Sequence, residues 1–307
     1  MEFANIIYKV ESGIATIQLN RPKALNALNS EINKDIMEAL KLVQADSSVR
    51  VLILTGSEKA FAAGADIKEM ADATPRYAKE FCGLAIEINN LLESLPIPTI
   101  AAVAGFSFGG GCEMPLACDF RVGGPRTTMS FPEVGLGIIP GANGCARATA
   151  ILGPAKAKEL VMLTPMIPGA EAYKLGLLNW YVDSPDCAEL NEAAGAAKKA
   201  LKGAKKSGDD LAIAEAKKAF NAAESAAAKC EFETIYAKAV SVARQLMEKP
   251  ACALASAKAA INKAAIETVA AGKAQETTEF TLLFNTHDQK EGMAAMMEKR
   301  TPVFTHN

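Results

Sequence analysis

The first part of the chain alternates between two hydrophobic patterns. Short runs rich in β-branched residues lie at Ile6–Val10 and Ile14–Leu19, on either side of Glu11-Ser12-Gly13, and they predict a β-hairpin. From Ser30 to Val43 apolar residues recur every three or four positions, which predicts an amphipathic helix. Val51–Leu54 then returns to the pattern of a strand. The early chain therefore predicts strands that alternate with helices.

The middle of the chain continues this alternation. Glu80–Leu95 has helical spacing, Thr99–Val103 is a continuous apolar run typical of a buried strand, and Gly109-Gly110-Gly111 leads into another helix. Phe120–Ile139 mixes short strand-like pieces with glycine and proline, and Pro154–Leu163 is again helical. These patterns together predict an α/β (α+β) core.

The composition changes sharply after this core. Two Ala/Lys-rich segments, 188–206 and 211–229, are separated by the turn signal Ser207-Gly208-Asp209-Asp210, and they predict a helical hairpin whose first arm is about 28 Å long at 1.5 Å per residue. From Ala251 onward the pattern is helical, and Pro302 marks an irregular tail. We therefore expect a core over 1–187, an inserted hairpin over 188–247 that leads back to it, and a helical C-terminal region over 248–307.

Charge and composition narrow the class of protein. Among 307 residues, 33 Lys and Arg stand against 35 Asp and Glu, and half of the residues are hydrophobic. This composition excludes disorder for most of the chain and gives no global basic field for nucleic acid or an anionic membrane, so an anionic ligand must be bound by a few placed cations. The N-terminus lacks the apolar segment of a signal peptide, and no apolar stretch reaches the length of a membrane helix. A cytoplasmic protein is expected.

The number and spacing of the cysteines and histidines argue against several kinds of site. The seven cysteines include no CxxC pair, which argues against a disulfide framework and a zinc ribbon and favours buried thiols in a reducing compartment. The two histidines, His287 and His306, lie near the C-terminus, and no HExxH, GxxxxGK[ST] or early GxGxxG motif occurs. No metal site is expected, and acid/base chemistry by glutamate is what remains.

Two glycine-containing turns follow predicted strands. Lys59–Met70, with Gly64 at its centre, and Gly109-Gly110-Gly111 before Glu113 could both leave backbone N–H groups free to bind developing negative charge. Tight turns that only permit close packing explain both segments as well. Glu133 follows in an apolar segment, where it is expected to have a partner or to exchange a proton, unless it lies exposed in a loop. Two carboxylates in one apolar cleft would have coupled titrations, so that one could act as an acid and the other as a base.

Five blocks of the sequence, in order and with matching spacing, resemble the enoyl-CoA hydratase (crotonase) family. These blocks are Leu19–Leu28, Ala62–Lys68, Ala104–Glu113, Phe131–Gly141 and Asp288–Gly292. The resemblance implies a spiral of ββα repeats and a helical C-terminal region that forms a homotrimer, commonly paired into a homohexamer. It also implies a coenzyme A thioester as substrate, with no prosthetic group and no metal.

The resemblance also assigns roles to residues of this chain. The N–H groups of Ala65 and Gly110 would form the oxyanion hole, and the N–H of Gly141 would help to place a water molecule. Glu113 would be the base that activates this water for attack at C3 of a trans-2-enoyl-CoA, and Glu133 the acid that protonates C2. A carbon–oxygen lyase of this kind would produce a (3S)-3-hydroxyacyl-CoA.

Coenzyme A binding is assigned in the same way. Most of the implied residues lie along the pantetheine and nucleotide, and Lys68 and a neighbouring subunit's Lys299 would bind phosphates. A solvated helix face is the ordinary alternative for each of these two lysines. The full set is Lys23, Ala24, Leu25, Ala27, Ala63, Asp66, Ile67, Lys68 and Lys299.

Some residues depart from the family pattern. Asn143 and Cys145-Ala146 stand where Gly and Thr-Gln are usual, Phe106-Ser107-Phe108 replaces a more common Tyr-Ala-Leu, and the Ala/Lys hairpin is additional. Because of these departures, the resemblance does not determine the length and shape of the acyl group. They also leave open a double-bond isomerase, a cyclic dienoyl-CoA hydratase or an acyl-CoA hydrolase, and, from another class, a CoA-binding scaffold whose hairpin binds a partner.

Overall fold

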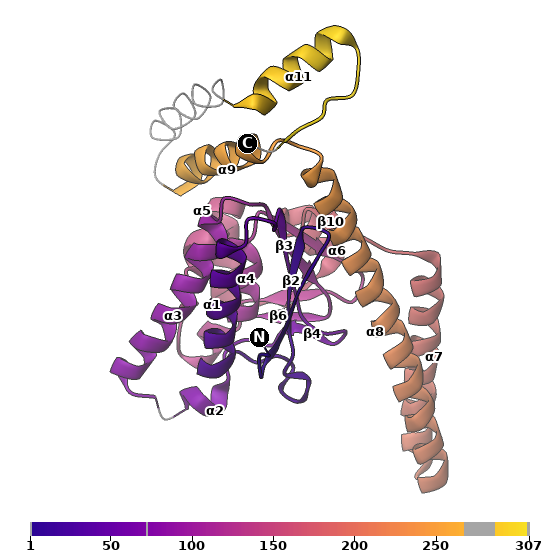
Figure 1. Cartoon of the computed structure of the whole chain (residues 1–307). Helices are drawn as coiled ribbons and strands as arrows, with labels where there is room; N and C mark the ends of the chain where they lie inside the picture. The colour runs from indigo at the N-terminus through magenta and orange to yellow at the C-terminus, as the bar shows by residue number, and fades with distance from the viewer. Residues whose placement is uncertain (1, 72, 267–285, 306–307) are drawn as a thin grey trace.

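A computed structural model of the protein describes residues 2–71, 73–266 and 286–305. Their strands form two sheets, one with the order β1-β2-β3-β5-β7-β10 and one with the order β4-β6-β8-β9 (Figure 1). The large sheet consists of β1 (Ile6–Glu11), β2 (Ile14–Leu19), β3 (Val51–Thr55), β5 (Thr99–Val103), β7 (Phe120–Gly123) and β10 (Trp180–Tyr181). The small sheet consists of β4 (Ala60–Ala62), β6 (Phe106–Phe108), β8 (Thr128–Ser130) and β9 (Ile167–Pro168).

The large sheet confirms the strands predicted from the hydrophobic pattern. β1 and β2 pair as the expected antiparallel hairpin, and β2, β3, β5, β7 and β10 run parallel. Every residue of β3 and β5 is buried. Parallel strands have continuous apolar sequences because both faces of their sheet are covered, and here one core cluster contains Leu52 and Leu54 while another contains Val51 and Ile53.

Helices cover both faces of the large sheet. On one face lie α1 (Ser30–Ala45) and α3 (Pro75–Ser94), whose buried positions include Ile36 and Ile88. Each begins where a side chain accepts a hydrogen bond from the first helical turn, Asn29 for α1 and Thr74 for α3. The other face is covered by the last part of α8 (Asp210–Met247).

The elements recur in the order of the expected spiral. Three times a strand of the large sheet is followed by a strand of the small sheet and then by helical segments: β3 and β4 lead to α2 (Ile67–Met70) and α3, β5 and β6 to α4 (Gly110–Ala117), and β7 and β8 to η2 (Glu133–Leu136) and α5 (Gly144–Leu163). α5 is kinked at Gly153, so its second part begins at the predicted Pro154. With α6 (Gly169–Leu175), α5 encloses a further core cluster.

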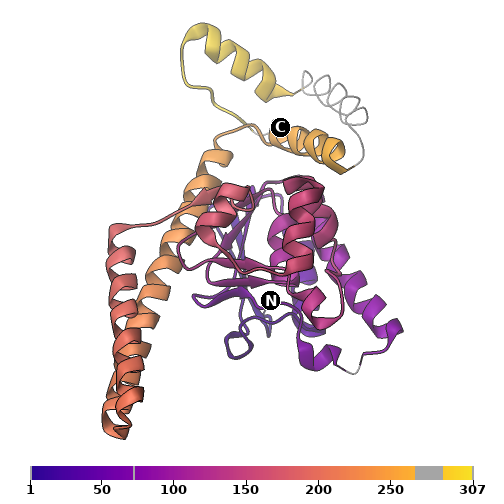
Figure 2. The ribbon, with the colours of Figure 1, turned by 180° about the vertical axis from the view of Figure 1, so that it is seen from behind.

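The Ala/Lys-rich segments form a pair of long helices. α7 (Pro185–Ser207) ends at Gly208, whose φ of +73° is a left-handed cap, and α8 then runs back beside it from Asp210. In both ribbon views the far ends of α7 and α8 extend away from the core (Figure 1 and Figure 2). α8 does not stop at Cys230. From Ala227 onward one face of the helix is buried, and Ile235, Ala239 and Val242 of this face pack against the large sheet.

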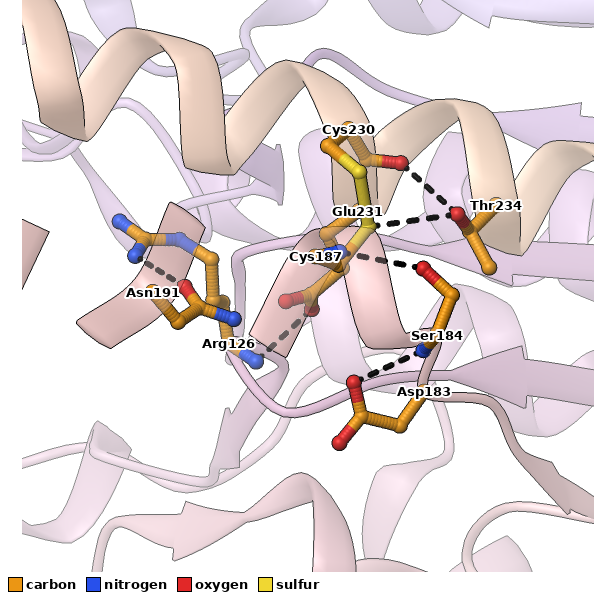
Figure 3. The surroundings of a disulfide bond; sticks show 8 residues. All are labelled: Arg126, Asp183, Ser184, Cys187, Asn191, Cys230, Glu231 and Thr234. Carbon is orange, nitrogen blue, oxygen red and sulfur yellow. Dashed lines mark hydrogen bonds between the residues drawn. A yellow bond between two sulfur atoms is a disulfide. The ribbon is translucent and has the colours of Figure 1, made fainter. Parts of the chain in front are cut away.

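A disulfide joins the two helices where they meet the core. Cys187 of α7 and Cys230 of α8 are bonded across 43 residues of sequence (Figure 3). The expectation of buried, reduced thiols is therefore wrong for this pair, because the absence of CxxC says nothing about cysteines that the packing of two helices brings together. Cys112 and Cys118 are buried free thiols, as predicted.

Removing this disulfide should weaken the attachment of the helix pair without changing the rest of the fold. A cross-link that closes a loop of this length typically contributes about 2–4 kcal/mol, because it restricts the unfolded chain. We expect Cys187→Ser/Cys230→Ser to lower the thermal midpoint and to speed proteolysis between residues 188 and 229. Dithiothreitol should reproduce this effect in the wild type and have no effect on the double variant. Equal stability of the two proteins under oxidising conditions would contradict this expectation.

The C-terminal region is helical, as predicted, in the residues that the structure describes. α9 (Ala251–Ile266) and α11 (His287–Glu298) are followed by an irregular tail that contains Pro302. Lys258 and Asn262 of α9 donate hydrogen bonds to backbone carbonyls at the C-terminal end of α3 and just beyond it, which fixes α9 on the core. Among all described helices, none has the length and apolar character to cross a membrane.

Candidate active site

Three turns lie at one edge of the small sheet. β4, β6 and β8 are parallel neighbours, so the segments that leave their carboxyl ends begin side by side. Ala65, Gly110 and Glu133 lie within a few residues of these three strand ends. A Cβ atom placed on Gly64 would lie 3.2 Å from the carbonyl oxygen of Phe108, which measures how closely the first two turns approach. The sheet therefore brings together the segments that the sequence singled out.

The Gly109-Gly110-Gly111 turn has features that fit both alternatives considered from the sequence. A Cβ on Gly111 would lie 2.1 Å from the carbonyl oxygen of Ala62, so this glycine permits close packing of α4 on β4. Gly109 has a φ of +51°, and a Cβ there would lie 2.8 Å from Oε1 of Glu133. Its neighbour Gly110 is the first residue of α4, where the helix presents unpaired N–H groups.

The N–H groups of Ala65 and Gly110 are both available to a ligand. Leu28 pairs with Ala65 as an isolated bridge, in which its N–H donates to the carbonyl of Gly64 (2.8 Å) and its carbonyl accepts from Asp66 (2.8 Å). The N–H of Ala65 consequently points away from Leu28. Within the part of the chain that the structure describes, neither this N–H nor that of Gly110 has a hydrogen-bond acceptor.

Glu113 is buried and held by backbone N–H groups. Only 3% of the residue is exposed, and Oε1 accepts hydrogen bonds from the N–H of Ala142 and of Gly144, each at 2.8 Å. Burial raises the pKa of this carboxyl, whereas the two N–H donors and the charge of Arg147 oppose the rise. These donors stabilise the ionised form, which is the form that a general base needs.

Glu133 is also buried, but it has fewer partners. Its Oε2 atom has no hydrogen-bond partner among the described residues. Burial, reinforced by the nearby charge of Glu113, raises the pKa of Glu133 to about 7. With this pKa, Glu133 retains its proton in part of the molecules at neutral pH. The exposed-loop alternative is wrong, because only 7% of Glu133 is exposed. The two carboxyls interact electrostatically, as the sequence analysis anticipated.

Gly141 lies against helix α3, next to a residue that binds Glu113. A Cβ atom on Gly141 would lie 2.7 Å from Sγ of Cys82, so this glycine packs directly against α3. The next residue, Ala142, supplies one of the two N–H groups that hold Glu113. The segment from Gly141 to Gly144 therefore forms one wall of the site.

The residues expected to bind coenzyme A form a second group beside Ala65. Lys23 and Ala24 lie in the short helix η1 (Pro22–Ala24), and the carbonyl of Leu25 accepts a hydrogen bond from Ala63 at 3.0 Å. Arg21 connects Ala27 to α2, because its guanidinium donates hydrogen bonds to the carbonyl of Ala27 and to the carboxylate of Asp66, the N-cap of α2. Ile67 and Lys68 follow in α2, and both are exposed.

Asp66 and Lys299 differ from the other residues of this set in what surrounds them. Asp66 forms an ion pair with Arg21 at 3.1 Å and caps α2 through a hydrogen bond from Lys68, so its carboxylate holds the turn together. Lys299 directly follows α11, which lies at the opposite end of the molecule from α2 (Figure 1). A single chain therefore does not bring Lys299 to the other eight residues.

Sequence reasoning missed two side chains that contact this site. Arg147 and Asn89 each donate a hydrogen bond to the carbonyl of Ala142, the residue whose N–H holds Glu113. Asn89 could have been noticed as a polar residue on the buried face of α3, because Ile88 and Leu92 of the same face are buried in the core. No signal in the sequence identifies the partners of Arg147.

Comparison with known proteins places this geometry in a family. The enoyl-CoA hydratase/isomerase family model matches residues 9–234 and 227–307. The chain belongs to the enoyl-CoA hydratase/isomerase (crotonase) family. Its family relatives include the crotonyl-CoA hydratase of Syntrophomonas wolfei, which is 34% identical with 99% of each chain covered. The short-chain-enoyl-CoA hydratase of Clostridium acetobutylicum is 33% identical over 98% of this chain and 97% of its own.

Solved structures agree with this assignment to the crotonase fold. The enoyl-CoA hydratase of Bacillus anthracis superposes with a TM-score of 0.79 and 27% identity, covering 99% of this chain and all of its own. The α/β architecture with two sheets and long helices toward the C-terminus is therefore that of the crotonase family.

Proposed function

We propose that the chain is an enoyl-CoA hydratase that adds water syn across the double bond of a short trans-2-enoyl-CoA to give a (3S)-3-hydroxyacyl-CoA. The observation that carries this proposal is the pair of buried carboxyls in contrasting environments. Glu113 is held by two N–H donors, and Glu133 has a pKa raised to about 7. The names of the relatives from Syntrophomonas wolfei and Clostridium acetobutylicum support both the reaction and a short acyl chain.

The proposed reaction assigns one proton transfer to each carboxyl. Glu113 takes a proton from water as the water oxygen bonds to C3, and Glu133 gives its proton to C2. The electrons of the double bond pass through C2 toward the thioester, whose oxygen becomes negative in the transition state. The N–H groups of Ala65 and Gly110 would bind this oxygen, and one such donor is typically worth about 3–4 kcal/mol. The N–H of Gly141 would help to place the water.

Coenzyme A binding is proposed for the group beside Ala65. Lys23, exposed on η1, and Lys68, exposed on α2, are cations near the oxyanion donors, as a thioester carried on a phosphorylated nucleotide requires. Lys299 is proposed to act from a neighbouring subunit, which would make the site depend on a homotrimer or homohexamer. No prosthetic group takes part in this reaction. A cytoplasmic location remains part of the proposal.

An acyl-CoA panel tests the reaction and the acyl preference together. The purified protein is incubated with crotonyl-CoA, longer trans-2-enoyl-CoAs, a 3-enoyl-CoA, a cyclic dienoyl-CoA and a saturated acyl-CoA. We expect loss of the enoyl absorbance with crotonyl-CoA and a 3-hydroxybutyryl-CoA product of S configuration on chiral chromatography. Double-bond migration or release of free coenzyme A in place of the hydroxyacyl product would overturn the assignment.

A further inference from the structure

Ala142 is held from both sides. Its N–H donates to Oε1 of Glu113, and its carbonyl accepts from Nδ2 of Asn89 at 3.1 Å and from Nη1 of Arg147 at 3.2 Å. Gly144, two residues further on, donates the second hydrogen bond to the same Glu113 oxygen. The position of the Glu113 carboxylate therefore depends on how firmly this short segment is fixed.

Arg147 is anchored on the side away from Ala142. Its Nη2 atom forms an ion pair with Oε2 of Glu93 at 3.0 Å and donates to Oδ1 of Asn90 at 3.2 Å. The Arg147 side chain is only 9% exposed, so this pair is screened little by solvent. A planar guanidinium can bind the carbonyl and the two α3 side chains at once, whereas an ammonium group is a point charge on a flexible stem.

The part of α3 that carries these anchors is itself fixed. Asn262 of α9 donates to the backbone carbonyl of Glu93 at 2.9 Å, and Lys258 donates to the carbonyls of Leu92 (3.2 Å) and Ile97 (3.1 Å). Lys258 also pairs with Asp119 at 2.9 Å. Contacts thus run continuously from α9 through α3 and Arg147 to the segment that holds Glu113.

We propose that Arg147, anchored by Glu93 and Asn90, is a positioning residue for the reaction, because it fixes the Gly141–Gly144 segment that holds the Glu113 carboxylate. This inference rests on the proposed hydratase function. Arg147 has no assigned contact with substrate and acts through Ala142. Its charge also favours the ionised form of Glu113. Within the described parts of the chain, the other ionisable groups that interact with Glu113 are Glu133 of η2, Cys82 of α3, Cys112 of α4 and Cys145 of α5.

Two substitutions separate the geometric from the electrostatic contribution. Arg147→Lys keeps the charge and loses the guanidinium fork, and Arg147→Gln loses both. We expect kcat for crotonyl-CoA to fall about 10-fold in Arg147→Lys and about 100-fold in Arg147→Gln, with KM changed less than threefold. The acidic limb of the kcat pH profile should move to higher pH in Arg147→Gln, because losing a nearby cation raises the pKa of Glu113, and Arg147→Lys should partly restore it. Arg126→Lys, which alters a guanidinium bonded to Asn191 and Glu224 beside α7 and α8, is the matched control.

A measurement without substrate separates failure of this inference from failure of the proposed function. In protein labelled with ¹³C at the glutamate carboxyl carbon, the Glu113 signal is identified by its loss in Glu113→Gln, and its titration is followed in the wild type and in Arg147→Gln. A raised Glu113 pKa in the variant supports the inference even where crotonyl-CoA is not hydrated. Unchanged titration, or a loss of activity that follows only a loss of folded protein in thermal melts, would overturn it. Asn89→Leu, which removes the other donor to Ala142, should lower kcat and shift the pH profile less than Arg147→Gln does, because it removes no charge.

Discussion

Replacing either glutamate by glutamine should nearly abolish hydration of crotonyl-CoA. Each proton transfer by a placed side chain typically contributes a factor of about 10² to 10⁴, so we expect kcat to fall by that factor in Glu113→Gln and in Glu133→Gln. Glutamine keeps the size of the side chain and can still accept the hydrogen bonds from Ala142 and Gly144, so KM should change little. Loss of enoyl absorbance in steady state measures both constants.

Glu231 provides the matched control for these variants. It is another buried glutamate, 2% exposed, whose burial raises its pKa to about 7. It lies beside the disulfide, where Oε1 accepts from the N–H of Arg126 at 2.7 Å (Figure 3). Glu231→Gln should therefore retain kcat within about twofold. Comparable activity in Glu113→Gln, Glu133→Gln and the control would contradict the two-carboxyl mechanism.

The pH profile assigns the two roles. In the free enzyme kcat/KM should rise with pH as Glu113 loses its proton, and it should fall above about pH 7 as Glu133 loses the proton that it must deliver. Residual activity of Glu133→Gln should lack the alkaline limb, and residual activity of Glu113→Gln should lack the acidic limb. Because the two carboxyls interact, the limbs report apparent values of the pair. The reverse pattern would exchange the base and the acid.

The hydrophobic pattern predicts the parts of the fold in which burial repeats along the chain. β3 and β5 are buried at every position, and their apolar runs are continuous, while the apolar spacing of α1 follows its one buried face. The strands of the small sheet are different. β4, β6 and β8 have three residues each, which is too short for a pattern to repeat, although they carry the turns of the site.

The candidate site likewise has features that the sequence predicts and features that it does not. Local sequence identifies the turns at Gly64 and Gly109 and the carboxyl of Glu133 in apolar surroundings. The contacts that set their chemistry connect distant segments, as when Asn89 binds the carbonyl of Ala142 across 53 residues. The disulfide between Cys187 and Cys230 is missed for the same reason, since the pairing depends on how α7 and α8 pack. Patterns in the local sequence carry no information on pairs of residues that are far apart along the chain.

A single methyl group on Gly109 should have an effect as large as removing a glutamate. Gly109 has φ +51° and ψ −124°, a conformation that side-chain-bearing residues rarely adopt, and its strain typically costs about 1–3 kcal/mol. The new Cβ would also lie 2.8 Å from Oε1 of Glu133, so either the carboxyl or the turn must move. Movement of the turn would redirect the N–H of Gly110. We therefore expect Gly109→Ala to lower kcat at least 100-fold, the typical effect of losing one oxyanion donor.

The control for Gly109→Ala lies in the helical turn that begins at Glu133. A Cβ on Gly135 would have no neighbour within 4 Å, so Gly135→Ala should fold normally and keep kcat within about threefold. Circular dichroism and thermal melts establish whether Gly109→Ala is folded, and crotonyl-CoA kinetics are then measured on the folded fraction. A folded Gly109→Ala protein with wild-type kcat would mean that the group displaced by the new methyl, either the Glu133 carboxyl or the Gly110 N–H, takes no part in the transition state. At least one of the two proposed roles would then be wrong, because the new Cβ cannot be accommodated without moving the carboxyl or the turn.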